Sequence, residues 1–155
     1  MSSFQAGHGF AERPFAALVI GLNRERAHLY RRIEERIDWQ LANGLLEETR
    51  ALLGRGYLRH GPALTGLGYR QAAAYLAGEY DCQEMVRRFK RDTRRFAKRQ
   101  MTWFRRQEGT TWVMIPESEP LEATVDRVMR HIDAFLSALE AIEGSARPSE
   151  AQQGD

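Results

Sequence analysis

The residues best suited to chemistry lie in one stretch, Thr93 to Arg105, with the sequence TRRFAKRQMTWFR. This stretch belongs to a longer run, Arg87 to Arg106, which holds ten of the 23 Lys and Arg residues and one acidic residue, Asp92. Like charges four residues apart on a helix repel each other unless acids or phosphates lie beside them. The local charge density therefore favours a polyanionic partner, and a solvated basic helix face is the alternative interpretation.

An aromatic ring and an amide accompany these cations. Trp103 lies within two helical turns of the Lys98-Arg99-Gln100 cluster, a combination that suits unstacked bases and phosphates. A core position is the alternative for Trp103. Apolar side chains recur at helical spacing and predict one helix over residues 84–106. The residues expected on its buried face are Met85, Phe89, Phe96 and Phe104.

The remaining sequence predicts the elements that must hold this helix. Apolar spacing and glycine boundaries predict further helices over residues 24–43, 45–54, 69–76 and 119–140, and Asp81 is expected to cap the basic helix. Two apolar runs, residues 15–22 and 111–115, predict short strands. Because an isolated pair of strands is only marginally stable, we expect most of their sheet to be missing from this sequence.

Length and composition limit the class of protein. The 155 residues suffice for one domain with a core, and the net charge of +2 means that the basic character is local. One cysteine and the lack of a signal peptide favour the cytoplasm. The lack of a long apolar run argues against a membrane partner. We expect residues 1–13 to be a flexible lead-in, 14–140 to form the folded part and 141–155 to be disordered.

The basic stretch also carries a more specific signal. Its string resembles the signature near the C-terminus of the tRNA dimethylallyltransferases, also called tRNA isopentenyltransferases, which reads roughly TR-x-[YFL]-AKRQ-x-TW-[FL]-R. Other matching pieces occur in the expected order, and the resemblance covers about Pro14 to Trp112. These pieces are Leu29-x-x-Arg32-Ile33-x-x-Arg36, Asn43-Gly44-Leu45-x-Glu47-Glu48, Gly68-Tyr69-Arg70-Gln71 and Tyr75-Leu76-x-Gly78.

The resemblance implies a fold and a reaction. The fold is the predominantly α-helical C-terminal part of an α/β P-loop fold, with five or six helices and two short strands of an otherwise missing parallel sheet. The family transfers a dimethylallyl group from dimethylallyl diphosphate to N6 of adenosine 37 in tRNA, using a P-loop, Mg²⁺ and a catalytic aspartate. No G-x-x-x-x-G-K-[ST] string and no identifiable magnesium ligand occur in this sequence, so we expect the chain alone to be inactive.

The resemblance also implies site residues. Arg36 corresponds to the arginine that faces the diphosphate of the prenyl donor; from spacing alone, Arg32 and Arg36 indicate surface ion pairs with Glu35 and Asp38. Two segments correspond to those that contact the anticodon stem-loop of the tRNA. Their residues are Thr65, Gly66, Leu67, Gly68, Tyr69, Arg70, Lys98, Arg99, Gln100, Met101, Thr102, Trp103, Phe104 and Arg105.

Two other classes of function fit the same residues. A non-catalytic RNA-binding module would keep the basic helix and bind RNA with a strong salt dependence. An interaction protein would instead add its two strands to the sheet of a separate N-terminal P-loop half and restore an enzyme. The two interpretations make different predictions for the chain alone, because an RNA-binding module needs no protein partner and an interaction protein does.

Overall fold

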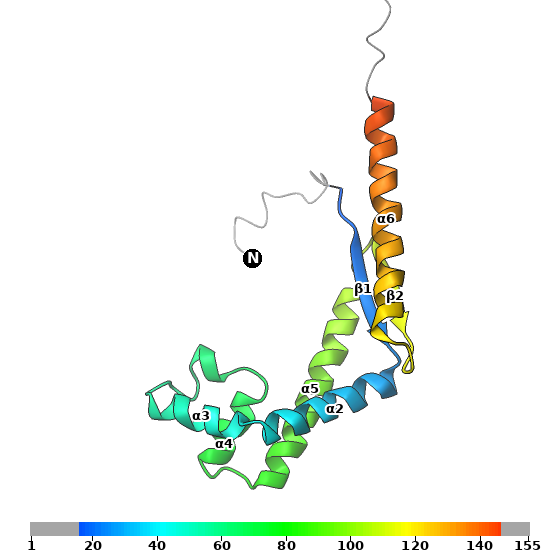
Figure 1. Ribbon diagram of the computed structural model, residues 1–155. Helices are drawn as coiled ribbons and strands as arrows, with labels where there is room; N and C mark the ends of the chain where they lie inside the picture. Colours follow the sequence, from blue (N-terminus) through cyan, green and yellow to red (C-terminus); the bar gives the residue numbers. More distant parts are fainter. Residues whose placement is uncertain (1–15, 147–155) are drawn as a thin grey trace, which may run out of the picture. The chain divides into compact units, whose positions relative to one another are not determined.

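The computed structural model describes residues 16–146 and is mostly helical (Figure 1). The elements in chain order are β1 (Val19–Arg24), α2 (Arg26–Ala42), α3 (Leu45–Gly54), the 3-10 helix η1 (Pro62–Leu64), α4 (Tyr69–Leu76), α5 (Cys82–Phe104), β2 (Thr110–Ile115) and α6 (Leu121–Ala146). The five helices and two strands match the prediction. The expected lead-in, residues 1–13, and residues 147–155 of the expected disordered tail lie outside the described residues, whereas residues 141–146 of that tail continue α6.

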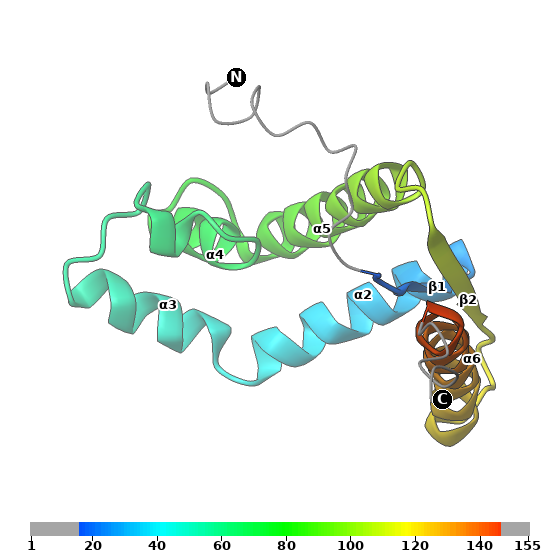
Figure 2. The ribbon, with the colours of Figure 1, turned by 90° about the horizontal axis from the view of Figure 1, so that it is seen from above.

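The described residues form two compact units. The helical unit comprises residues 24–108 and 114–117, and the sheet unit comprises the other described residues, which hold most of the two strands and all of α6. In the helical unit, α3 packs on α4, and α5 packs on both α2 and α4 (Figure 2). The core of this unit contains Ile37, Leu45 and Phe89, with Ile33, Leu41, Leu67 and Tyr69 packed against it.

Glycine sets the geometry where α4 begins. Gly68 precedes α4 with a φ of 96°, a left-handed conformation that favours glycine. A Cβ atom at this position would lie 2.9 Å from the ring of Phe89, so the backbone of α4 approaches α5 closely here. The backbone conformation and the close packing against Phe89 therefore each require glycine at this position.

The helix α5 starts at Cys82, close to the predicted boundary. The Asp81 side chain accepts a hydrogen bond from the Glu84 backbone N–H at 2.8 Å, which confirms the predicted N-cap. The reciprocal half of a capping box does not form, because the Glu84 carboxylate accepts hydrogen bonds from Arg87 and Arg88 instead. Glu84 thus anchors the first cations of the basic run.

Burial along α5 differs from the prediction in its second half. Met85 and Phe89 are buried, but Phe96 and Phe104 are 42% and 43% exposed, so the prediction that they are core residues is wrong. The physical reason is that α2 and α4 contact α5 upstream of them. Hydrogen bonds and ion pairs to those helices involve three residues that all precede Phe96, namely Lys90, Asp92 and Arg94.

The sheet consists of β1 and β2, which are parallel neighbours. The Trp112 ring packs over the backbone of Gly21, where a Cβ atom would lie only 2.6 Å from the ring. Val113 is buried, whereas Val19 and Leu22 of β1 are about half exposed. The first strand starts and ends later in the sequence than predicted. Its apolar side chains are only partly covered by the residues that the structure describes.

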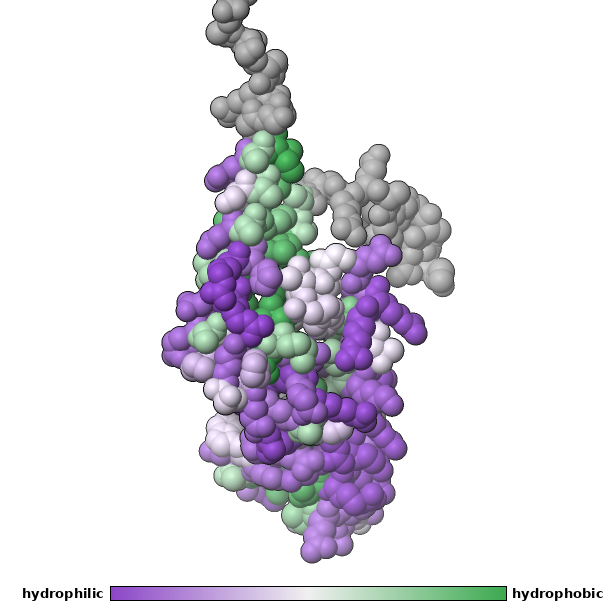
Figure 3. Space-filling view, turned by 90° about the vertical axis from the view of Figure 1, so that its right-hand side faces the viewer, coloured by the Kyte–Doolittle hydropathy of each residue, from purple (hydrophilic) through white to green (hydrophobic). Residues whose placement is uncertain are grey.

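The helix α6 exposes much of its apolar surface (Figure 3). Val125 and Leu136 are 48% and 49% exposed, and Leu121, Met129 and Ile142 are exposed as well. Phe135 is only partly buried. Within residues 16–146, no helix combines the length and the apolar character that a membrane span requires.

Candidate nucleic-acid interface

Cations follow one face of α5 along most of its length. Steps of three and four residues place side chains on the same side of a helix, and a span of 18 residues covers about 27 Å. We call this surface the basic face of α5. Its members are Arg88, Arg91, Arg95, Lys98, Arg99 and Arg106. Arg106 follows the last helical turn, and the others lie within the helix.

An open concavity of about 440 Å³ lies at the C-terminal half of this face. We call it the tryptophan concavity, because Trp103 borders it together with Arg95, Lys98, Arg99, Thr102 and Arg106. None of its four cationic groups forms an ion pair with a carboxylate among residues 16–146. By contrast, Lys90 and Arg94 on another side of α5 are paired with Asp38 and Glu34 of α2. The cations of the concavity are thus available to an external anion.

Trp103 is presented to solvent rather than packed in the core. Its side chain is 59% exposed, and its ring meets the edge of Phe104 with centroids 4.8 Å apart at 83°. The guanidinium of Arg99 lies 5.7 Å from the centre of the Phe96 ring. The two phenylalanines predicted as core residues therefore support the exposed tryptophan and arginine, which fixes a planar ring beside unpaired cations.

A second concavity, of about 340 Å³, lies between α4 and the N-terminal half of α5. Four arginines line it, so we call it the arginine pocket: Arg59, Arg70, Arg88 and Arg91. Its lining also includes Gln71 and Ala74 of α4, which are 2% and 6% exposed. All of its residues belong to the helical unit.

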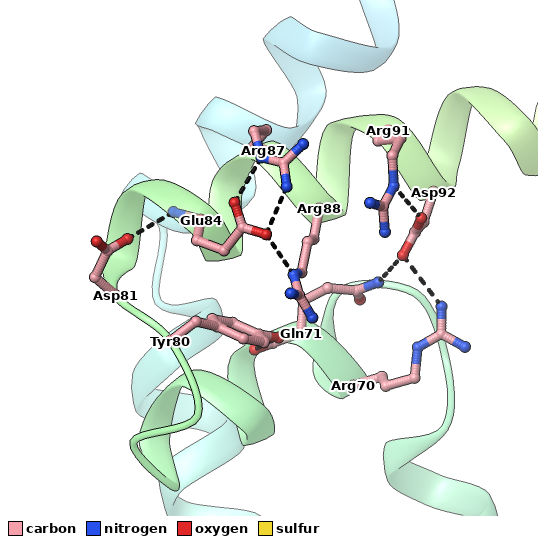
Figure 4. A network of polar contacts seen from close by, with 9 residues as sticks. All are labelled: Arg70, Gln71, Tyr80, Asp81, Glu84, Arg87, Arg88, Arg91 and Asp92. Carbon is pink, nitrogen blue, oxygen red and sulfur yellow. Dashed lines mark hydrogen bonds and ion pairs between the residues drawn. The ribbon is translucent and has the colours of Figure 1, made fainter.

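A buried glutamine joins the segment before α4 to α5 (Figure 4). The Gln71 Oε1 accepts a hydrogen bond from the Gly68 backbone N–H at 3.0 Å, and its Nε2 donates to Asp92 Oδ2 at 3.0 Å. The Tyr80 hydroxyl donates to the Gln71 backbone carbonyl at 2.9 Å. No role for Gln71 was predicted from its position, although it belongs to the Gly68-Tyr69-Arg70-Gln71 string that resembles the family.

The carboxylates of this region are held ionised by their neighbours. Burial alone would raise the pKa of Asp92, but hydrogen bonds from Arg91 and Gln71 and the nearby Arg70 lower it below its ordinary value. Hydrogen bonds from Arg87 and then Arg88 lower the pKa of Glu84 to about 2. Asp92 and Glu84 are therefore negatively charged near neutral pH and fix the arginines around them.

The first predicted tRNA-contacting segment is divided between surface and core. Thr65 and Gly66 are exposed, and so is Arg70, whose Nη2 lies 3.5 Å from Asp92 Oδ2. Leu67, Gly68 and Tyr69 are partly or fully buried, and the Tyr69 hydroxyl donates to Glu48 at 2.9 Å. That hydrogen bond raises the pKa of Tyr69.

The second predicted segment, residues 98–105, lies on the exposed end of α5. Met101 is partly buried there, and the other members, Gln100, Thr102 and Arg105 included, are exposed. The first segment contacts α5, and the second segment forms the C-terminal end of the same helix. Asp92, which contacts the first segment, precedes Lys98 by six residues, or about 9 Å along α5.

Arg36 lies on the exposed surface of α2. The ion pairs expected for Arg32 and Arg36 do not form, because Asp38 pairs with Lys90 of α5 at 2.8 Å and Glu35 makes no ion pair with a described residue. The prediction from spacing is wrong for this reason: a residue on another helix competes for the carboxylate. The Arg36 guanidinium is unpaired within residues 16–146.

The part of the chain that the structure describes contains no group of three or more His, Cys, Asp and Glu side chains arranged to hold a metal ion. The Mg²⁺ that the resemblance implies therefore finds no fitting ligand set among these residues.

Sequence comparison relates the chain to one group of enzymes. A protein-family model described as IPP transferase matches residues 1–107. The tRNA dimethylallyltransferase of Geobacter metallireducens is 48% identical over 116 residues, which is 75% of this chain and 38% of that protein. The tRNA dimethylallyltransferase 2 of Geotalea daltonii is 44% identical over 136 residues, which is 88% of this chain and 40% of that protein.

Solved structures agree with this relationship. The full-length tRNA isopentenylpyrophosphate transferase of Bacillus halodurans has a TM-score of 0.76 and 32% identity, over 82% of this chain and 41% of that one. The corresponding enzyme of Staphylococcus epidermidis has a TM-score of 0.71 and 28% identity, over 77% and 38%. The chain spans about two fifths of these relatives and corresponds to the helical C-terminal part of their P-loop-like fold, as predicted. The chain therefore belongs to the IPP transferase family.

Proposed function

We propose that this chain forms the tRNA-recognising part of a tRNA dimethylallyltransferase. The complete reaction transfers a dimethylallyl group from dimethylallyl diphosphate to N6 of adenosine 37 in tRNA, in the cytoplasm. The observation that carries the proposal is the tryptophan concavity, in which an exposed ring and four unpaired cations share one end of a helix. A family match over residues 1–107, which includes every residue that lines this concavity, supports the choice of tRNA.

Each group in the concavity suits a part of an RNA loop. Trp103 offers a face on which an unstacked base can stack, and Lys98 and Arg99 offer charge to the flanking phosphates. Arg70 would contact the same RNA from the end of the first segment. Reading a loop base requires that it leave its stack, which also exposes the exocyclic amine that the reaction modifies.

We assign Arg36 to the diphosphate of the prenyl donor, by resemblance to the family. A guanidinium presents paired N–H groups to phosphate oxygens and stabilises the negative charge that builds up on the leaving group. The unpaired state of Arg36 on α2 is consistent with this role, since no described carboxylate occupies it. The printed sequence has no P-loop string, so we propose that the 155-residue chain does not catalyse the transfer by itself.

The test is a fluorescence anisotropy titration of the 155-residue chain with a labelled anticodon stem-loop that bears adenosines at positions 36 and 37. A loop-scrambled RNA and two salt concentrations complete the experiment. Trp103→Ala removes the proposed stacking ring, and Trp39→Ala is the matched control, because Trp39 is a 65% exposed tryptophan of α2 outside the concavity. Tyr69→Ala is a poorer probe, since Tyr69 packs against the core.

We expect Trp103→Ala to weaken binding of the cognate loop by about 5-fold to 150-fold, the equivalent of one stacked base, and Trp39→Ala to leave it unchanged. Equal effects of the two substitutions would contradict the assignment of Trp103. Equal affinity for cognate and scrambled loops would instead identify a non-specific RNA-binding module. Prenylation of tRNA by the purified chain would overturn the proposal that it is inactive alone.

A second candidate function is supported by the exposed apolar side chains of the two strands. Val19, Leu22 and Met114 of the two strands are 47% to 53% exposed, which is the surface that further strands and a covering layer would bury. Under this second hypothesis, the chain adds its strands to the sheet of a separate N-terminal P-loop half and so completes the enzyme. Mixing the chain with the N-terminal part of a relative should then slow amide exchange in β1 and restore prenylation, whereas unchanged exchange in β1 would exclude the pairing.

A further inference from the structure

We propose that the arginine pocket is a second RNA contact, which binds a phosphodiester group of the RNA backbone. The inference rests on the proposed function and extends it, because Arg59, Arg88 and Arg91 lie outside both predicted tRNA-contacting segments. Only Arg70 belongs to them. The pocket would add affinity without reading sequence, since a phosphate is the same at every nucleotide.

Arg88 is held in place from two sides. Its Nε donates to the Glu84 carboxylate at 2.6 Å, and its guanidinium carbon lies 4.6 Å from the centre of the Tyr80 ring. Tyr80 is itself fixed by the hydrogen bond from its hydroxyl to the Gln71 backbone (Figure 4). A guanidinium ordered in this way loses little conformational entropy when it binds a ligand.

The arginines around Asp92 retain donors for a ligand. Arg91 donates its Nε to Asp92 at 2.9 Å, and the Nη2 of Arg70 lies 3.5 Å from the same carboxylate. Each guanidinium carries five N–H groups, so most of them stay available. Asp92 therefore positions two arginines on one side of the pocket without using up their hydrogen-bonding capacity.

The charge of the lining favours an anion. Four arginines face two carboxylates, Glu79 and Asp92, which leaves a formal excess of two positive charges among the Arg, Asp and Glu side chains of the lining. The geometry also favours a phosphate over a base. The only aromatic ring in the lining apart from the imidazole is that of Tyr80, and Arg88 already covers it.

The position of the pocket suits a strand that also reaches Trp103. Arg91 of the arginine pocket precedes Arg95 of the tryptophan concavity by four residues, so the two concavities are separated by about 6 Å along the basic face of α5. Arg91, Arg95 and Arg99 form one row of cations along this face. A single RNA backbone can follow this row of cations from the arginine pocket to the tryptophan concavity.

The test compares Arg88→Gln and Arg59→Gln with the control Arg50→Gln, an exposed arginine of α3 that lines neither concavity. Affinities of the 155-residue chain for the cognate and scrambled stem-loops are measured at five salt concentrations. We expect each pocket substitution to weaken both RNAs equally, by 3-fold to 10-fold at low salt. The slope of log affinity against log salt should become shallower by about 0.7 to 1, because one phosphate contact is lost. The control should change neither quantity.

Two further arms separate this inference from its competitors. Arg59 lies in a different segment from Arg88, so the pair of variants, each checked by circular dichroism, keeps the test valid if Arg88→Gln unfolds. Unchanged RNA binding in both folded variants, together with loss in Trp103→Ala, would overturn the pocket and leave the proposed function intact. No RNA binding by the unaltered chain would overturn both. Titration with inorganic pyrophosphate is the last arm: binding abolished by Arg88→Gln, with RNA affinity unchanged, would assign the pocket to a free diphosphate and overturn the RNA contact.

Discussion

At the scale of single residues, Gln71 determines how the family segment before α4 meets the basic helix. Its side chain spans from the Gly68 backbone to Asp92 of α5, and its backbone carbonyl accepts a hydrogen bond from Tyr80. At 2% exposure, none of these groups has water as an alternative partner. Gln71 thus positions Arg70 and Asp92 relative to each other, although it does not itself need to touch a ligand.

We expect Gln71→Leu to lower the free energy of unfolding by about 1–3 kcal/mol, because the Gly68 N–H would lose its partner and stay buried. Gln83→Leu at the exposed start of α5 is the matched control and should change stability by less than about 0.5 kcal/mol. Urea unfolding followed by circular dichroism measures both. An unchanged free energy of unfolding in Gln71→Leu would mean that the two hydrogen bonds of the Gln71 side chain contribute little to the stability of the fold.

At the scale of elements, α5 changes its role along its length. The part before Phe96 packs through Met85 and Phe89 and forms ion pairs with α2. Acidic residues of that neighbouring helix therefore offset part of its charge. Its second half exposes Phe96, Phe104 and cations without described carboxylate partners. The same amphipathic pattern therefore serves first as a core-forming surface and then as the proposed binding surface.

The start of α5 should respond to pH through Glu84. Because hydrogen bonds from Arg87 and Arg88 place its folded-state pKa at about 2, below its ordinary value of 4.5, the carboxylate stabilises the fold above about pH 4.5. That contribution is lost as the pH falls from 4.5 through 2. We therefore expect Glu84→Gln to reduce the melting temperature at pH 7 and the difference from the unaltered chain to shrink between pH 4.5 and pH 2.

Thermal unfolding at pH 7, 4.5 and 3 checks this prediction. Glu47→Gln is the control for the loss of one negative charge, because Glu47 is an exposed glutamate of α3 without an ion pair among the described residues. A difference between Glu84→Gln and the unaltered chain that stays constant over this range would show that the Arg87 and Arg88 hydrogen bonds do not favour the ionised carboxylate.

At the scale of the whole molecule, the helical and sheet units differ in how well they bury their apolar residues. The helical unit has a contiguous core around Ile37 and Phe89 and four consecutive buried positions in α4, Gln71 to Ala74. The sheet unit has most of two strands and a helix whose apolar side chains are largely exposed. Stability should therefore be distributed unevenly between the units.

Hydrogen exchange measured by mass spectrometry should reveal this difference in the chain alone. We expect the slowest amides in α4 and in residues 85–93 of α5, and exchange faster by at least tenfold in β1 and in the second half of α6, because few buried contacts oppose local opening there. Addition of the cognate stem-loop should slow exchange in residues 95–106 but not in α6. Uniform exchange across both units would contradict the unequal distribution of stability.

The sequence by itself determined the helices, the N-cap at Asp81, the two strands and the family. Each of these depends on local information: apolar period, a capping side chain, a glycine boundary or a literal string. The family string also pointed to Trp103 and its neighbouring cations. Spacing could not show that Phe96 and Phe104 are exposed, because periodicity identifies an apolar face without showing where the covering helices end.

Only the tertiary structure decided which charges are neutralised and which are available. Asp38 pairs with Lys90 of another helix rather than with Arg36 two positions away, and Gln71 reaches Asp92 across 21 positions of sequence. The arginine pocket likewise draws Arg59, Arg70 and Arg88 from three separate segments. Such contacts depend on how helices cross in space, and pairings between residues far apart in the sequence leave no trace in the spacing within any one segment.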